Sequence, residues 1–492
     1  MNYKMVLNIL GKTMLITASL MMLPMLVGII YQENNFINFL IPILVFLAIG
    51  APFAFCKAKS TSIYAKEGFI IVALAWIILS LVGALPFVIG GEIPNYIDAL
   101  FETVSGFTTT GSSILSGVQI ESLSRASAFW RIFTHWIGGM GVLVFVLAVI
   151  PNENQGIMHV YRSESPGPSS SKLVSKIKKT TRILYLIYVG MTIAEIIFLA
   201  FSGISFYECV MTAFSTAGTG GFSMYGDSIA HYANIGHKSA VYIEMVVASF
   251  MFLFGVNFNV YYLLLTGGVI KALKSEEVRA YLFLVLGAII IIAFNILNTV
   301  ANFGEALRYS FFQVTAVSST TGFVSFDFDT WPVLSKTLLL LLMIVGGCGG
   351  STAGGMKVSR LVLVVKSLGK DIKRTVHPRA ITSFQFEDQP VSKEMESSVK
   401  TYVLLYFIII VVSTIILSID AFAGDVMTNL SSAITSISNV GPGLGKLVGA
   451  TGNFSGYGAF SKIVLCFNML AGRLEILPIL IMFSPQTWIK GK

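Results

Sequence analysis

A short run of small and hydroxylated residues, SGFTTTGSS at 105–113, lies between two long apolar stretches. In lipid, a non-helical backbone leaves N–H and C=O groups unsatisfied, so it is tolerated only where protein buries it or where it lines a wet cavity. Related runs return three times, each after a short amphipathic segment and before another apolar stretch. They are FSTAGTGGFS at 214–223, SSTTGFVS at 318–325 and SISNVGPGLG at 436–445. These four runs, called loops 1 to 4, predict four equivalent segments arranged around one axis.

The composition indicates that the chain lies in a membrane. Of its 492 residues, 55% are hydrophobic and 12% are charged, whereas soluble proteins average roughly 25% charged residues. A chain of this length with so few charges could not cover a surface that faces water. Because its apolar stretches are long enough to cross as helices, we expect an all-α polytopic membrane protein.

The net charge of +8 is distributed in a way that argues against nucleic-acid binding. Lys and Arg gather in alternate loops, as the positive-inside rule predicts for cytoplasmic segments. The densest basic group runs through 366–400, and the acidic residues of the intervening loops are Glu33, Glu92, Asp98, Asp227, Glu305, Asp327, Asp329, Asp420 and Asp425. We therefore expect both termini in the cytoplasm and acidic outer loops that raise the local concentration of cations.

The chain divides into an N-terminal hairpin and four units of one kind. The hairpin, in a unit at 1–66, has predicted helices at 13–30 and 36–56. Each later unit has a span, a half-helix that enters from outside, a loop and a second span. The units are predicted at 67–160, 161–271, 272–366 and 367–492. Their spans are expected at 69–90 and 127–150, 182–202 and 239–270, 280–300 and 333–366, and 399–419 and 459–483, with half-helices at 94–107, 205–216, 304–317 and 424–436. The expected fold is thus four pseudo-symmetric helix–pore-loop–helix repeats around one pore, preceded by a transmembrane hairpin.

The four loops share a residue pattern that suits an alkali cation. Each has glycine after small or hydroxylated residues, and none contains Asp or Glu. A desolvated K⁺ needs oxygen ligands, which rings of backbone carbonyls supply in potassium-selective filters, and glycine reaches the unusual dihedral angles required. The candidate filter residues are Thr109, Thr110, Gly111, Thr219, Gly220, Gly221, Thr320, Thr321, Gly322, Asn439, Val440 and Gly441. In loop 2 either Gly220 or Gly221 could be the equivalent glycine, and Gly221 is favoured because Gly221-Phe222 mirrors Gly322-Phe323.

Longer motifs resemble the superfamily of K⁺ transporters that includes the Trk, Ktr and plant HKT proteins, over nearly the whole chain. They are ETVSGFTTTGSS (102–113), FWRIFTHWIGGMGVLVF (129–145), AFSTAGTGGFS (213–223), GGCGGSTAGGMKVSR (346–360) and GRLEILPILIMFSPQTW (472–488). The N-terminal hairpin resembles the Trk branch rather than KtrB. The resemblance implies potassium uptake across the bacterial inner (plasma) membrane, with a glycine in each filter loop tied to K⁺ preference. Loop 4, with Asn-Val-Gly, departs most from the shared pattern.

The longest apolar span is interrupted by GGCGGSTAGG at 346–355. Six glycines in ten positions make a straight helix implausible, since each costs roughly 1 kcal/mol against alanine. The segment resembles the family's intramembrane loop, which lies beneath the filter and obstructs the pore. A glycine-rich packing site is the alternative. The candidate gate residues are Gly346, Gly347, Gly349, Gly350, Ser351, Thr352, Ala353, Gly354 and Gly355, together with Arg473.

Arg473 lies deep in the last predicted span, two residues before Glu475. A charge inside a membrane is expensive and is usually functional or paired. Arg473 is either a structural contact to Glu475 or to backbone carbonyls, or, as the family match implies, a cation just inside the filter that regulates permeation. Lys357 is expected at the inner end of its span, with its side chain reaching the interface.

The resemblance also implies partners: a homodimer with one pore per protomer, and a TrkA-type cytosolic regulatory ring that binds nucleotides. K⁺ is the transported ion, and the sequence has no motif for an organic cofactor. Two mechanisms are compatible with the residues, a K⁺-selective channel-like pore and a secondary transporter that couples K⁺ to H⁺ or Na⁺. For the second, Glu195 and Glu244 are the acids inside predicted spans, and neither has an evident relay partner. We do not expect an enzyme, because the histidines are scattered and lack HExxH-type spacing.

Overall fold

The chain opens with a helical hairpin, in a computed structural model that describes residues 2–56, 65–141, 177–379, 383–420, 424–445 and 447–488. Helices α1 (Tyr3–Leu20) and α2 (Met22–Ile30) form one apolar span, and α3 (Phe36–Ala54) returns beside α1. The two backbones approach closely, since a Cβ on Gly11 would lie 2.3 Å from the Ala54 nitrogen. The predicted hairpin is therefore present, although its first helix starts at Tyr3 and not at residue 13.

Six helical segments in the described part of the chain are long and apolar enough to cross a membrane. They are Tyr3–Ile30, Phe36–Ala54, Lys66–Ile89, Thr181–Ala200, Glu276–Asn295 and Lys393–Leu417. The third combines α4 (Ala65–Gly83) with α5 (Leu85–Ile89), and the last three correspond to α11 (Ile177–Ala200), α17 (Glu276–Asn295) and α21 (Lys393–Leu417). Because about 20 apolar residues cross a hydrocarbon core of about 30 Å, the protein is a multi-pass membrane protein, as predicted.

Four shorter helices match the expected half-helices. They are α6 (Tyr96–Phe107), α12 (Phe206–Gly218), α18 (Phe303–Ser318) and α22 (Val426–Ser438). Each begins where a polar side chain accepts a hydrogen bond from a first-turn amide, the usual way to satisfy an N-terminal donor; the capping residues are Asn95, Ser205, Asn302 and Asp425. Each ends inside its loop, one or two residues before the first predicted filter residue at 109, 219, 320 or 439, so the predicted positions of these helices agree closely with the structure.

The second helix of each repeat is shorter than predicted. These helices are α8 (Arg125–Gly139), α14 (Ala240–Phe254), α19 (Val333–Val345) and α23 (Ala459–Arg473). The last three stop at a break and are followed by α15 (Phe258–Leu265), α20 (Val358–Val376) and α24 (Leu477–Phe483), and α14 and α15 meet at 91°. The spans predicted at 239–270 and 459–483 are thus each divided by a break, at residues 255–257 and 474–476. The inner part of the predicted span 127–150 lies outside the described residues.

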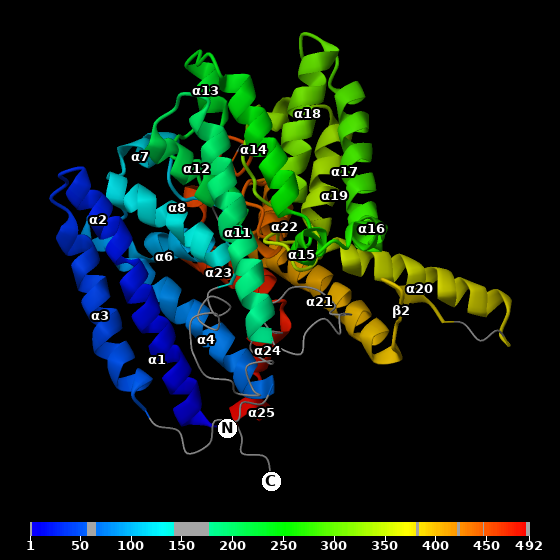
Figure 1. The fold of residues 1–492 in the computed structure, drawn as a ribbon, viewed down its shortest axis with the longest axis horizontal. Helices are drawn as coiled ribbons and strands as arrows, with labels where there is room; N and C mark the ends of the chain where they lie inside the picture. Colours follow the sequence, from blue (N-terminus) through cyan, green and yellow to red (C-terminus); the bar gives the residue numbers. More distant parts are fainter. Residues whose placement is uncertain are drawn as a thin grey trace.

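The repeats pack in a cycle (Figure 1). The first helices α4, α11, α17 and α21 each contact the half-helix of their own repeat, and the second helices each contact the half-helix of the next: α8 packs on α12, α14 on α18, α19 on α22, and α23 returns to α6. One apolar core combines the N-terminal hairpin with repeats 1 and 4, and others fill repeat 2 and the junction of repeats 3 and 4. Four repeats around one centre confirm the predicted fold class.

The remaining elements are short connections around this cycle. They are α7 (Gly117–Ser122), α13 (Ala230–Asn234), α16 (Val269–Lys274), the 3-10 helices at Phe328–Thr330 and Phe454–Gly456, and α25 (Pro485–Trp488). Strands β1 (Gln385–Phe386) and β2 (Gln389–Pro390) pair antiparallel, with Gln385 opposite Pro390. Figure 1 shows α20 projecting sideways from the bundle, with this small hairpin beside it.

Candidate functional site

The four loops adopt one backbone conformation at equivalent residues. A non-glycine residue follows the half-helix with a φ of 53°, 53°, 57° and 55° at Thr109, Thr219, Thr320 and Asn439. Two residues later comes a glycine at positive φ, 80° at Gly111, 81° at Gly221, 75° at Gly322 and 107° at Gly441. Left-handed backbone favours glycine. By this geometry Gly221, and not Gly220, occupies the position equivalent to Gly111.

These glycines form a closed circle, which we call the loop ring and define as residues 109–111, 219–221, 320–322 and 439–441. Each glycine faces a carbonyl of the next loop. A Cβ would lie 2.0 Å from the Gly220 oxygen if built on Gly111, 2.0 Å from the Thr321 oxygen on Gly221, 1.9 Å from the Val440 oxygen on Gly322, and 2.8 Å from the Thr110 oxygen on Gly441. The structure therefore brings all twelve predicted filter residues together.

In the middle residue of each triplet, the amide forms a hydrogen bond within the protein and the carbonyl does not. The N–H groups of Thr110, Gly220, Thr321 and Val440 donate to carbonyls five residues earlier in their own half-helices, at 2.9, 2.9, 2.8 and 3.1 Å. Within the described residues, no protein hydrogen bond reaches the carbonyl oxygens of these same four residues. Buried backbone acceptors normally have a partner. The ring thus presents oxygen atoms that a bound cation could use.

Side-chain contacts tie neighbouring loops to each other. The Ser112 hydroxyl donates to the Gly441 carbonyl at 2.9 Å, and the Asn439 amide donates to the Thr110 hydroxyl at 2.9 Å. Asn439 also donates to the Met469 carbonyl at 2.9 Å. These bonds close the circle between the first and last repeats, which are more than 300 residues apart in sequence.

A buried ion pair braces the outer ends of loops 1 and 2. Arg131 of α8 donates to Glu102 of α6 at 2.6 Å, and both side chains are almost fully buried. Glu102 also accepts from the Ile114 amide at 2.9 Å, and Arg131 donates to the Ser223 carbonyl at 3.0 Å. The pair therefore connects segments on both sides of the repeat boundary.

His135 braces the same two loops lower down. Its Nε2 accepts from the Phe222 amide at 3.2 Å, so Nδ1 carries the proton and donates to the Gly106 carbonyl at 2.7 Å. The position of the imidazole also explains why residue 220 is glycine, because a Cβ there would lie 2.2 Å from the His135 ring. Gly220 makes room for this side chain, whereas Gly221 belongs to the circle of glycines.

The segment between α19 and α20, residues 346–357, runs under the loop ring, and all of it is buried except the half-buried Gly350. On its upper side, the Gly355 amide donates to the Ser438 carbonyl at 2.8 Å and the Gly354 amide to the Thr320 hydroxyl at 2.6 Å. On its flank, the Cys348 amide donates to the Gly255 carbonyl at 3.0 Å, in the break of repeat 2. This 346–357 loop thus contacts loops 3 and 4 and the broken helix of repeat 2.

Arg473 joins this loop to repeat 1. Its guanidinium donates to the Thr352 carbonyl at 2.9 Å and to the carbonyls of Gly138 and Gly139 at 2.5 and 2.6 Å. Of the structural contacts considered for Arg473, the one to backbone carbonyls is found. Glu475 instead forms an ion pair with Arg360. Lys357 is also placed differently from the prediction, because it is buried within the loop and donates to the Ala353 carbonyl.

Carboxylates line the outer side of the half-helices. Asp425 accepts from the Thr428 hydroxyl and amide, and these hydrogen bonds lower the pKa of Asp425. Asp329 accepts from the Gly445 and Ala450 amides at 3.0 and 3.3 Å, while partial burial raises its pKa. Asp227 lies 3.1 Å from His231. Acidic groups of repeats 2, 3 and 4 therefore lie in the segments that flank the half-helices and the loops.

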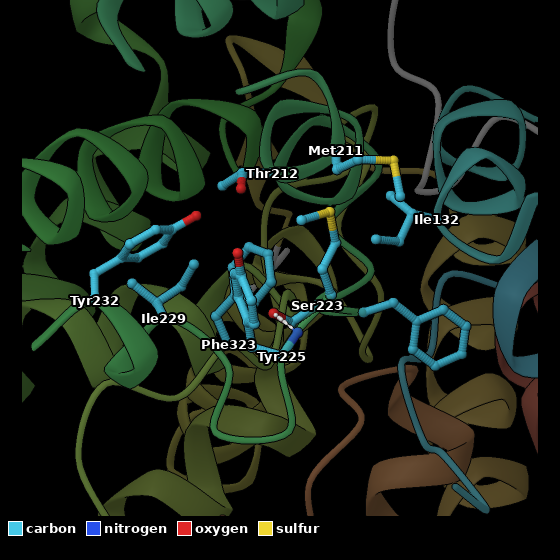
Figure 2. A pocket seen from close by; sticks show the side chains of 10 residues that line it. Ile132, Met211, Thr212, Ser223, Tyr225, Ile229, Tyr232 and Phe323 are labelled. Carbon is cyan, nitrogen blue, oxygen red and sulfur yellow. Dashed lines mark hydrogen bonds between the residues drawn. The ribbon is translucent and has the colours of Figure 1, made fainter. Parts of the chain in front are cut away.

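A small pocket lies behind the outgoing part of loop 2 (Figure 2). Its walls come from three repeats, including Ile132 of α8, Met211 of α12 and Phe323 of loop 3. The lining is mainly apolar, and the dashed contact in Figure 2 joins the Tyr225 amide to the Ser223 hydroxyl at 3.1 Å. Apolar packing here supports the back of loop 2.

Sequence reasoning missed the braces around the ring. Glu102 and Arg131 are charges inside membrane segments, and such charges are expected to be paired or functional, so their presence was an available signal. For His135 the sequence shows no partner, because the partners are a carbonyl at Gly106 and an amide at Phe222.

This architecture, in which four half-helices end at one ring beneath acidic outer ends, defines a polytopic membrane protein built around a central site. The chain belongs to the TrkH family, described as cation transport proteins, whose model matches residues 33–492. This confirms the resemblance found in the sequence.

Similar proteins cover the chain almost end to end. It is 34% identical to the Trk system potassium uptake protein TrkH of Salmonella typhimurium, over 99% of this chain and 100% of that protein. It is 32% identical to the Trk system potassium uptake protein TrkG of Escherichia coli, over 95% of each. The crystal structure of the potassium transporter TrkH from Vibrio parahaemolyticus matches with a TM-score of 0.87 at 28% identity, covering 99% of this chain and 100% of that one.

Proposed function

We propose that this protein takes up potassium through a K⁺-selective, channel-like pore whose filter is the loop ring. The observation that carries the proposal is the circle of four equivalent loops with unengaged carbonyl oxygens. The C-terminal ends of α6, α12, α18 and α22 lead into this circle, and a helix C-terminus carries partial negative charge that favours a cation. Backbone oxygens then replace the water around a K⁺ ion.

The gate in this proposal is the 346–357 loop together with Arg473. The loop lies under the ring and is held to it by the Gly354 and Gly355 amides. Arg473 adds a positive charge at the same level, bound to the Thr352 carbonyl. A cation there repels K⁺, so movement of the loop and of Arg473 would open the pathway.

We further propose the assembly that the family suggests. The units are those predicted at 1–66, 67–160, 161–271, 272–366 and 367–492, and two protomers form a homodimer with one pore each in the bacterial inner membrane. Helices α1 and α25 reach the same end of the molecule (Figure 1), which supports two cytoplasmic termini. A TrkA-type ring docks on this face. Catalysis of a chemical reaction is not part of the function, and K⁺ is the cargo.

The alternative is a secondary transporter that couples K⁺ to H⁺ or Na⁺. Such coupling needs a titratable group in the membrane. Glu244 does have a partner, Arg308, at 3.2 Å, which favours a fixed ion pair over a proton relay. Glu195 is fully buried in α11 and is the acid that this alternative would use.

The deciding experiment is a reversal-potential measurement on the purified chain in planar bilayers. Our proposal expects a potential that follows the K⁺ gradient alone and stays constant when pH or Na⁺ differs across the membrane. A potential that moves with the pH or Na⁺ gradient would establish the alternative. Equal permeation of K⁺ and Na⁺ would reject the loop ring as a potassium filter.

A further inference from the structure

Glu277 lies in the first turn of α17 with only 4% of its surface exposed. One carboxylate oxygen accepts from the Gly349 amide at 2.6 Å and from the Ser359 amide at 3.1 Å. The other accepts from the Asn257 side chain at 3.3 Å. A single buried carboxylate therefore holds the middle of the 346–357 loop, the start of α20 and the break in repeat 2.

The contact with Ser359 takes the place of a missing helix cap. Helix α20 begins after Lys357, which has a φ of 78° and provides no side-chain cap. The free amides of a helix start need an acceptor and favour a negative charge. Glu277 supplies both from the first helix of the same repeat, so the end of the loop is held in place by α17.

The start of α17 is in turn hydrogen-bonded to the β1–β2 hairpin. Glu387, in the turn between β1 and β2, accepts from the Ser275 hydroxyl at 2.7 Å and from the Glu277 amide at 3.0 Å. Lys366 of α20 contacts Glu276 and donates to the Gln385 carbonyl at 2.8 Å. Phe386 of the hairpin is buried with Leu363 and Val399. The hairpin is thus packed against both helices that hold the loop.

We infer that Glu277 is the positioning residue that keeps the 346–357 loop beneath the ring. We also infer that the β1–β2 hairpin transmits movements at the cytosolic face to this loop. This inference rests on the proposed gate. A force on the hairpin acts on Glu387, then on the start of α17, and through the Glu277 carboxylate on Gly349 and Ser359. Without the carboxylate, the buried amides lose their acceptor, and the loop loses its preference for this position.

The test uses Cys348 as a natural reporter, because this thiol lies within the loop and is fully buried. In the full chain with Cys56, Cys209 and Cys466 replaced by Ser, a membrane-impermeant thiol reagent is applied from the cytoplasmic side of proteoliposomes. We expect Glu277→Ala to raise the labelling rate of Cys348 by about tenfold and to raise Rb⁺ uptake without any regulatory ring. Glu277→Gln keeps an oxygen acceptor and should restore much of the wild-type behaviour. Glu394→Ala, which removes an exposed acid from the first turn of α21, is the matched control and should change neither readout.

Glu387→Ala, in the hairpin itself, provides a second test that spares the buried carboxylate. It should shift both readouts in the same direction, and combining it with Glu277→Ala should add nothing, because both act through one connection. Wild-type labelling and uptake in folded Glu277→Ala and Glu387→Ala, while Arg473→Ala still raises uptake, would overturn the inference and leave the proposed gate standing. If even the unmodified chain fails to conduct K⁺, the proposed function itself fails.

Discussion

At the residue scale, two separate requirements select glycine in the loop ring. The first is the positive φ, which residues that carry a Cβ adopt at a cost of about 1–2 kcal/mol. The second is space, because a Cβ on Gly111, Gly221 or Gly322 would lie about 2 Å from a backbone oxygen of the next loop. A backbone oxygen cannot rotate away as a side chain can, so substitution displaces the carbonyl that a cation would use.

We therefore predict that Gly111→Ala abolishes K⁺ uptake. The added methyl group would overlap the Gly220 carbonyl, and overpacking of this kind costs about 1–3 kcal/mol. Rb⁺ uptake into proteoliposomes measures the effect. Gly190→Ala is the control, because a Cβ at Gly190 in α11 meets nothing within 4 Å and uptake should be unchanged. Normal uptake by Gly111→Ala would argue that loop 1 is not part of the pathway.

The Glu102–Arg131 pair allows a second prediction about single residues. Arg131→Gln leaves a buried carboxylate without its cation, which costs about 3–5 kcal/mol when such a pair is broken. We expect a clear fall in the thermal unfolding temperature of the detergent-purified protein, together with loss of uptake. Lys400→Gln removes a cation from the exposed pair with Asp371 and should change stability by less than about 1 kcal/mol. Equal effects of the two substitutions would contradict a bracing role for Arg131.

At the scale of elements, the broken second helices determine what lies under the ring. Helices α14, α19 and α23 are followed by breaks at residues 255–257, 346–357 and 474–476. The breaks expose backbone carbonyls and amides, which then bind each other and Arg473. Among these three breaks, the one in repeat 3 is the longest, and its chain extends beneath the loop ring.

Arg473→Ala is the prediction for this element. The substitution removes three hydrogen bonds that join the 346–357 loop to repeat 1 and removes a positive charge below the ring. We expect K⁺ flux to increase in vesicles that contain the chain alone. Arg473→Lys keeps the charge but cannot reach three carbonyls in the same geometry, so its flux should lie between that of the unmodified chain and that of Arg473→Ala. Unchanged flux in Arg473→Ala would count against its part in gating.

At the scale of the whole molecule, the repeats form a cycle that the last one closes. Helix α23 packs on α6, and Lys462 pairs with Asp98 across this contact at 2.6 Å. The symmetry is only approximate, because the Glu102, Arg131 and His135 braces lie at the junction of repeats 1 and 2. Loop 4 instead uses Asn439 to bind loop 1 and Met469.

The proposed orientation predicts which residues face each side of the membrane. In a cysteine-free background, Val118→Cys, at an exposed site in α7, should react with an impermeant thiol reagent added to intact cells. His377→Cys, at the exposed end of α20, should react only after the membrane is permeabilised. Mass-shift labelling on gels measures both. The opposite pattern would invert the proposed topology and place the termini outside.

The amino-acid sequence by itself determined the class of the protein, its hairpin, the half-helices and the alignment of loops 1 to 4. Each of these depends on local properties: the length of an apolar run, a capping residue such as Ser205 or Asp425, and a glycine at one position of a short pattern. Such signals are contained within one segment of chain, so they can be read without knowing the partners.

Only the tertiary structure decided which groups meet. Arg473 was recognised as an unusual charge, but its binding to Thr352 rather than Glu475 depends on how repeats 1, 3 and 4 fit together. The same holds for the bridge from His135 to Phe222, 87 residues away, and for Glu277, whose donors Gly349 and Ser359 lie 72 and 82 residues away. Buried polar groups must find a partner wherever the packing places one, and the packing of four similar repeats is set by the whole chain at once.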